Sequence, residues 1–177
     1  MHRLFVALRP PPAMRAALLA TMDGIDGARW QDDGQLHLTL RYIGAVERPV
    51  AEDVALALHR VHAPALDLAL DGVGHFDAKR GGRSVWAGVA PGDAVKALHH
   101  KIDHALVAIG LPPEGRAFVP HVTLARLNRG CGPIDGFLAA HAALTSPPVR
   151  FDRFVLYESH LSPDGAWYEP VVRYPLD

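Results

Sequence analysis

Apolar and polar residues alternate strictly in two short stretches that share a pattern. Residues 36–40 read Leu-His-Leu-Thr-Leu, and residues 121–124 read His-Val-Thr-Leu. Because residues two apart in a strand point to the same face, each stretch predicts a strand with one apolar face and one face that carries histidine and threonine. Alternation, or a short apolar run between turn residues, predicts further strands at residues 4–8, 66–70, 84–89, 151–161 and 167–176.

Segments between these strands have the apolar spacing of helices. The three prolines at residues 10–12 precede the first predicted helix, since proline is tolerated in a first turn. Apolar residues recur every three or four positions over residues 50–61 and again over residues 95–109, where Gly110 ends the pattern. A shorter helix is predicted around Phe137.

The elements occur twice in one order: strand, helix, His-x-Thr strand, helix, strand. Shifting the sequence by 81 residues places Pro10 on Pro91, and shifting it by 84 places His37 on His121. We therefore predict an α+β fold in which two pseudo-symmetric lobes, each an antiparallel sheet flanked by helices, surround a central cleft. The expected organisation is a single domain over residues 1–177, made of duplicated lobes at about 1–80 and 81–177. Exchange of strands between the lobes is left open.

Composition narrows the class of protein. The 177 residues are 49% hydrophobic and 21% charged, which excludes a disordered chain. A net charge of -1 does not indicate a general nucleic-acid binder, although it permits one that binds a single terminus. Cys131 is the only cysteine, so neither a disulfide framework nor a thiolate metal site is available. No run approaches the roughly 20 apolar residues of a membrane span, and we expect a cytoplasmic monomer without an obligate protein partner.

Paired histidines at matching places suit attack at phosphorus. One neutral imidazole takes a proton from water and one imidazolium gives a proton to the leaving oxygen. The ordinary histidine pKa of about 6.5 serves both roles near neutral pH. One His-x-Thr among eleven histidines carries little information, but His37 and His121 each lie in an amphipathic strand at the same place in a repeated plan. The threonine hydroxyls of Thr39 and Thr123 are expected to donate to phosphate oxygens.

Longer stretches around the histidines resemble paired signatures of a known superfamily. Residues 36–44 read Leu-His-Leu-Thr-Leu-Arg-Tyr-Ile-Gly, and residues 116–126 read Arg-Ala-Phe-Val-Pro-His-Val-Thr-Leu-Ala-Arg. On these stretches the chain resembles the two-histidine phosphoesterases, and among them the RNA 2′,3′-cyclic phosphodiesterases, also called 2′–5′ RNA ligases (LigT-like). Residues 3–8 and 156–159, with Tyr168, extend the resemblance over nearly the whole chain.

The resemblance implies a bilobal α+β fold with no metal and no cofactor. It implies hydrolysis of a terminal 2′,3′-cyclic phosphate to a 2′-phosphate, with His37 as proton donor and His121 as proton acceptor. Thr39 and Thr123 match the phosphate-binding positions of the family, and Arg126 matches a basic residue that the family uses at its active site.

The choice between two arginines stays open. Strict alternation places Arg126 on the strand face opposite His121, so its use requires the strand to end or bulge. Arg41 has the correct parity with His37 and is a rival phosphate contact.

Several alternatives share the same residues. The substrate is an RNA 3′ end or a small cyclic nucleotide phosphate, and hydrolysis of 2′–5′ linkages or reversible 2′–5′ ligation would use the same site. A non-catalytic module that binds RNA ends is a hypothesis of another class. A metal-dependent hydrolase is disfavoured because no carboxylate lies beside either motif in a usual ligand pattern.

Other features of the sequence indicate function less strongly. The basic stretch at residues 79–83 is suited to RNA phosphates, and equally to a charged hairpin tip. His100 and His104, four residues apart, favour a solvated helix face over a metal site. Four aromatic residues are candidates for base stacking, although core packing is the commoner role of such residues: Trp30, Tyr42, Trp86 and Phe118.

Overall fold

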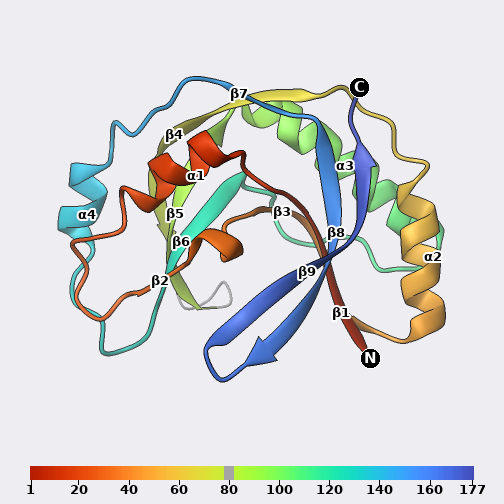
Figure 1. Cartoon of the computed structure of the whole chain (residues 1–177), viewed down its shortest axis with the longest axis horizontal. Helices are drawn as coiled ribbons and strands as arrows, with labels where there is room; N and C mark the ends of the chain where they lie inside the picture. Colours follow the sequence, from red (N-terminus) through yellow and green to blue (C-terminus); the bar gives the residue numbers. More distant parts are fainter. Residues whose placement is uncertain (78–81) are drawn as a thin grey trace.

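The computed structural model describes residues 1–77 and 82–177, and they form two antiparallel sheets with helices around them (Figure 1). The first sheet has the strand order β3-β1-β8-β9, and the second has the order β2-β6-β5-β4-β7. The strands are β1 (His2–Leu8), β2 (Arg29–Trp30), β3 (Leu38–Val46), β4 (Leu66–Phe76), β5 (Arg83–Ala90), β6 (His121–Leu127), β7 (Val149–Phe151), β8 (Arg153–Ser162) and β9 (Gly165–Pro175). The helices are α1 (Pro12–Leu19), α2 (Arg48–Leu58), α3 (Gly92–Ala108) and α4 (Asp135–Ala140), with a 3-10 turn, η1 (Asp33–Gln35). The predicted α+β class is confirmed.

Each sheet combines strands from both halves of the sequence. In the first sheet β1 pairs with β3 on one side and with β8 on the other, so the red strand β1 and the blue strand β8 lie side by side in Figure 1. In the second sheet β4 lies between β5 and β7. The sheets therefore do not coincide with the sequence halves 1–80 and 81–177, and a boundary at residue 80 itself falls outside the described residues.

One core joins the two sheets. Helix α3 contacts β3 of the first sheet and β5 of the second, and α2 contacts α3 and β1. The apolar stripe predicted for α3 is the buried one, with Val95, Leu98, Ile102 and Leu106 inside. Helix α3 thereby holds the sheets in a fixed relation, which a site between them requires.

Strand β1 is buried on both faces. Leu4, Val6 and Leu8 belong to the main core, whereas Phe5 and Ala7 form a second, small apolar cluster on the opposite face. Double burial explains why residues 4–8 read as a continuous apolar run rather than as an alternating one. The face with Phe5 is the one on which the candidate site is built.

Three details differ from the sequence prediction. The strand expected at residues 36–40 begins at Leu38, so His37 lies just before β3. The strand expected at 151–161 is two strands, β7 and β8. Strand β2 and turn η1 were not predicted, since two- and three-residue elements are set by their neighbours rather than by periodicity.

Candidate active site between the two sheets

A cavity of about 230 Å³ lies between the sheets, and the predicted site residues meet there. The residues that were predicted and that line it are His37, Thr39, His121, Thr123 and Arg126. His37 lies just before β3, Thr39 lies in β3, and the other three lie in β6. The residues that the sequence analysis did not assign to the site and that also line it include Gln35, Phe76, Arg116 and Tyr168.

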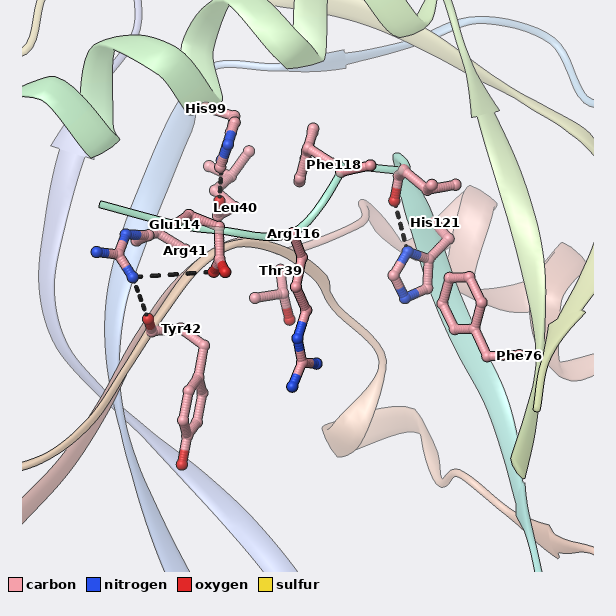
Figure 2. A pocket seen from close by; sticks show the side chains of 12 residues that line it. Thr39, Leu40, Arg41, Tyr42, Phe76, His99, Glu114, Arg116, Phe118 and His121 are labelled. Carbon is pink, nitrogen blue, oxygen red and sulfur yellow. Dashed lines mark hydrogen bonds and ion pairs between the residues drawn. The ribbon is translucent and has the colours of Figure 1, made fainter. Parts of the chain in front are cut away.

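The two histidines are held in the same way. The Nδ1 atom of His37 donates to the carbonyl oxygen of Gln35 at 2.7 Å, and Nδ1 of His121 donates to that of Val119 at 2.6 Å. Figure 2 shows the second of these bonds. A carbonyl oxygen can only accept, so each Nδ1 carries a hydrogen, and Nε2 of each neutral ring keeps its lone pair. Neither Nε2 has a hydrogen-bond partner in the described part of the chain.

Turn η1 explains how the backbone presents the Gln35 carbonyl. Asp32 Oδ1 accepts from the Gln35 N–H at 2.9 Å, and Gln35 Oε1 accepts from the Asp32 N–H at 3.0 Å. This reciprocal pair is a capping box. The Gln35 side chain also donates to the carbonyl of Ala166 at 2.8 Å, which ties the turn to β9. The Asp-x-x-Gln signal was present in the sequence before His37.

Each histidine packs against two aromatic rings. The His37 ring lies 4.9 Å from Phe5 and 5.1 Å from Tyr168, measured between centroids. The His121 ring lies 4.9 Å from Phe76 and 5.6 Å from Trp86. The two imidazoles therefore stand in similar apolar surroundings, one on each sheet.

Burial among these rings lowers both histidine pKa values. The pKa of His37 falls from 6.5 to about 4, chiefly through desolvation; the bond to Gln35 opposes the shift, and the positive charge of Arg126 adds to it. Desolvation also lowers the pKa of His121, against the bond to Val119. Both side chains are thus neutral near pH 7 in the free protein.

Bulges decide which arginine reaches the cavity. In β6 the pairing with β5 shifts register between Val85 and Trp86, and Leu124 and Ala125 are both buried. The extra residue breaks the alternation and brings Arg126 back to the face of His121 and Thr123. The bulge that the use of Arg126 required is present.

A matching bulge in β3 has the opposite effect on Arg41. The pairing with β1 shifts between Val6 and Ala7, and Leu40 and Arg41 are both buried. Arg41 is 7% exposed; its Nε donates to Asp103 at 2.8 Å, and its Nη1 lies 3.8 Å from Glu114. It does not line the cavity, so its parity with His37 was misleading.

Arg116 is a cation of the cavity that alternation could not reveal. It lies in the loop before β6, and Figure 2 shows its side chain reaching down between Thr39 and His121. In the described part of the chain no hydrogen bond or ion pair engages its guanidinium. Its position, five residues before His121 as Arg126 is five after, was the available signal.

The threonine hydroxyls are also uncommitted. Thr39 and Thr123 each lie two residues after a histidine and line the same cavity. Within the described residues neither hydroxyl has a hydrogen-bond partner. Two hydroxyls and two guanidiniums thus surround the histidines, a set of donors suited to the oxygens of one phosphate.

One group of side chains could hold a metal ion among the described residues, and it lies elsewhere. It consists of Glu158, His160 and Glu169 on β8 and β9. None of the three lines the cavity, and His160 Nε2 is already 3.0 Å from Glu169 Oε1. His100 and His104 are exposed on α3, as the sequence analysis expected.

The remaining residues considered for RNA binding lie either in the core or at the surface. Trp30 packs 5.7 Å from Phe137, Phe118 stacks on His99, and Tyr42 is exposed. The basic stretch begins with Lys79 and Arg80, which lie outside the described residues. Among the residues that the structure describes, every helix falls short of the length and apolar character that a membrane span requires.

Comparison with known proteins gives one consistent family. The family described as the 2′-5′ RNA ligase superfamily matches residues 10–162. The chain is 31% identical over 147 residues to an RNA 2′,3′-cyclic phosphodiesterase of Thermotoga maritima, covering 81% of this chain and 76% of that protein. It is 35% identical over 98 residues to the protein of that name from Aeropyrum pernix, covering 55% of this chain and 56% of that protein. The crystal structure of Escherichia coli LigT complexed with 3′-AMP superposes with a TM-score of 0.77 at 26% identity, covering 99% of this chain and 98% of that one.

Proposed function

Because the chain belongs to the 2′-5′ RNA ligase superfamily, we propose that it is an RNA 2′,3′-cyclic phosphodiesterase that opens a terminal cyclic phosphate to a 2′-phosphate. The observation that carries the proposal is the identical mounting of two histidines in one cavity, each with Nδ1 on a backbone carbonyl and Nε2 unengaged in the described part of the chain. Relatives with this name support the substrate class.

The reaction divides between the histidines. Nε2 of neutral His121 takes a proton from water, whose oxygen forms a bond to phosphorus. The bond from phosphorus to the 3′ oxygen breaks, and the protonated His37 gives its Nε2 proton to that oxygen. The product keeps the phosphate on the 2′ oxygen. The assignment of donor and acceptor follows the family, and the similar mounting of both rings supports their exchange of roles in the reverse step.

The lowered pKa values fit this division. A histidine that is neutral in the free protein is ready to act as base. The donor takes up its proton when the negatively charged cyclic phosphate binds beside it, since an opposite charge raises a histidine pKa. Arg116 and Arg126 balance the phosphate charge, and Thr39 and Thr123 donate to its oxygens.

The proposal extends to the origin of the domain. The equal Nδ1 bonds and the equal bulges after Thr39 and Thr123 support two duplicated lobes with exchanged strands, forming one domain over residues 1–177. The chemistry needs no metal, because both proton transfers have a histidine.

A direct assay tests the function. A short RNA ending in a 2′,3′-cyclic phosphate is incubated with the wild type, His37→Ala, His121→Ala and, as a control on the exposed face of α3, His100→Ala, all with EDTA. Turnover to a 2′-phosphate by the wild type and the control, lost in the two cavity variants, is expected. Loss of turnover in EDTA, or turnover in His121→Ala equal to wild type, would contradict the mechanism. If RNA cyclic phosphates are inert, 2′–5′ linked oligonucleotides are the next substrate, and binding without turnover indicates an RNA-end-binding module.

A further inference from the structure

A hollow of about 600 Å³ lies on the same face of the first sheet as His37. Val155 and Tyr157 line it, and both belong to the small apolar cluster that contains Phe5. Tyr168 lines this hollow and also the catalytic cavity. The Tyr168 ring lies 5.1 Å from the Phe5 ring and 5.1 Å from the His37 ring, measured between centroids. The side chain of Tyr168 therefore stands between the hollow and the catalytic cavity.

Three guanidiniums from separate segments line this hollow, and we call it the arginine hollow. Arg9 directly follows β1, Arg15 lies in α1 and Arg173 lies in β9. Burial and the positive charge of Arg15 lower the pKa of Arg9. Like charges held close together repel each other, so the arrangement favours a bound anion.

The carboxylates of the hollow balance only part of this charge. Asp33 accepts from Arg15 Nε at 3.0 Å and lies 3.5 Å from Arg9 Nη2, so one carboxylate serves two guanidiniums. In the described part of the chain Arg173 takes part in no hydrogen bond or ion pair. Two further arginines of the lining are exposed and each is paired with an aspartate: Arg150 with Asp67 and Arg153 with Asp152.

Backbone carbonyls hold two of the three guanidiniums in place. Arg9 Nη1 donates to the carbonyl oxygen of Asp33 at 2.6 Å and to that of Leu36 at 2.7 Å. Arg15 Nη1 donates to the carbonyl oxygen of Pro10 at 2.8 Å. The positive charge is therefore preformed, as the polar groups of small-ligand sites usually are.

The hydroxyl of Tyr157 is a donor without an acceptor. Tyr157 is 8% exposed and lines the hollow, and its hydroxyl has no hydrogen-bond partner among the described residues. Burial raises the pKa of this hydroxyl, and the positive charges of Arg9, Arg173 and Arg15 oppose the rise, so all three cations lie near it. Buried polar groups are normally paired, and an acceptor placed here would meet the hydroxyl and the guanidiniums together.

We propose that the arginine hollow binds a phosphate of the RNA strand upstream of the terminal nucleotide. Arg9, Arg15 and Arg173 balance the phosphate charge, and the Tyr157 hydroxyl donates to a phosphate oxygen. The proposal rests on the proposed function and adds a subsite for its substrate. The rest of an RNA strand is joined to its terminal ribose through the 5′ oxygen, so the strand must leave the catalytic cavity on one side. A strand that passes over Tyr168 reaches the arginine hollow.

The subsite implies a preference for strands over mononucleotides. A mononucleotide with its phosphate between the histidines has no second phosphate to place in the hollow, whereas a longer strand gains the contacts there. Contacts to phosphate oxygens carry no sequence information, so the gain is expected to depend on the length of the strand and not on its bases.

The test compares substrates of different length. Initial rates are measured on adenosine 2′,3′-cyclic phosphate and on oligoadenylates of two to five nucleotides that end in the same cyclic phosphate. The proteins are the wild type, Arg173→Gln, Tyr157→Phe and, as a control with an exposed ion pair on α2, Arg48→Gln. We expect Arg173→Gln to lower the ratio of kcat/KM on the longest strand to kcat/KM on the mononucleotide roughly tenfold, and Tyr157→Phe to lower it roughly threefold. Arg48→Gln keeps the ratio of the wild type.

Salt supplies a second readout that a merely structural role would not move. The logarithm of kcat/KM on the strand falls as the logarithm of the salt concentration rises, with a slope of roughly 0.7 for each phosphate contact to a single strand. Arg173→Gln is expected to make the slope shallower by about that amount. Tyr157→Phe loses no charge and keeps the slope of the wild type.

Unchanged ratios in Arg173→Gln and Tyr157→Phe would overturn the subsite. If the ratios are unchanged but calorimetry shows weaker binding of inorganic phosphate to Arg173→Gln, the hollow takes a free anion and the role of the strand is wrong. If the wild type turns over none of the esters, the proposed function is wrong, and fluorescence anisotropy of a labelled RNA pentamer with a 2′-phosphate end decides the subsite alone. Arg173→Gln must then bind the pentamer more weakly than Arg48→Gln does, and equal affinities overturn the proposal.

Discussion

Tyr42 and Arg126 occupy equivalent positions in the two sheets, each five residues after a histidine of the cavity and each beyond a bulge. Equivalent register shifts bring Arg126 to the cavity that contains both histidines and Tyr42 to an adjoining hollow of about 420 Å³. The two bulges thus bring a cation to the cavity and an aromatic ring to the adjoining hollow.

Removal of the Arg126 charge is expected to slow the reaction. Arg126→Gln loses a donor to the developing phosphate charge, and we expect kcat to fall roughly 100-fold. Because Arg126 helps to lower the pKa of His37, the variant also raises that pKa, so the alkaline limb of the kcat profile, which the donor sets once substrate has raised its pKa, moves to higher pH. Steady-state rates across pH measure both effects. Arg150→Gln, on a 62% exposed side chain, is the control for a lost surface charge, and equal rates for the variant and the wild type would remove Arg126 from the mechanism.

Arg41 is expected to matter for stability. Arg41→Gln removes a 7% exposed guanidinium that is paired with Asp103 and Glu114, whose side chains are 20% and 27% exposed, and leaves these partly buried carboxylates without their donor. Such losses cost about 3 kcal/mol of the free energy of unfolding. Denaturant unfolding of Arg41→Gln beside Arg48→Gln, whose ion pair is exposed, measures this. A stable Arg41→Gln variant with strongly reduced kcat would instead return Arg41 to the list of phosphate contacts.

Strict alternation of apolar and polar residues correctly placed the paired histidines and threonines on one face, but it placed the two arginines on the wrong faces. His37, Thr39, His121 and Thr123 precede the bulges, where parity still holds, and all four line one cavity. Beyond a bulge, the positions that face the cavity are those that strict alternation places on the opposite face. No pattern in the sequence marks the extra residue. Which of the two arginines reaches the cavity is thus decided by strand pairing.

Long-range pairing limited the prediction of the fold in a similar way. The order of elements was readable because apolar periodicity is local, as in α3. The joining of β1 to β8 across the length of the chain is not local, and neither is the packing of Tyr168 from β9 against His37. Arg116 was missed because loop residues follow no period, although its spacing from His121 mirrors that of Arg126.

The pH dependence of catalysis is expected to differ from that of two unperturbed histidines. The reaction needs one histidine neutral and one protonated, and burial lowers the pKa of both in the free protein. Since kcat/KM reports the free protein, both limbs of its bell lie below pH 6.5. Bound substrate raises the donor pKa, so the alkaline limb of kcat lies at higher pH than that of kcat/KM. Initial rates on a cyclic mononucleotide at constant ionic strength test this, and a kcat/KM bell centred above pH 7 would show that the rings are not desolvated as the structure has them.

The free energy of unfolding is expected to decrease as the pH is lowered, because the same burial lowers the pKa of His37. The pKa of His37 is about 4 in the folded protein and 6.5 without its surroundings, so between these values the unfolded chain binds more protons. Unfolding is therefore favoured as the pH falls from 6.5 towards 4, by up to about 3 kcal/mol from this residue alone. Asparagine at position 37 does not titrate, and His37→Asn is expected to show a shallower decline than the wild type over this range. Denaturant unfolding at several pH values measures the difference, with His100→Asn on the exposed face of α3 as control. Parallel declines for wild type and His37→Asn would place the pKa of His37 near its ordinary value and remove the basis for the displaced pH profile of catalysis.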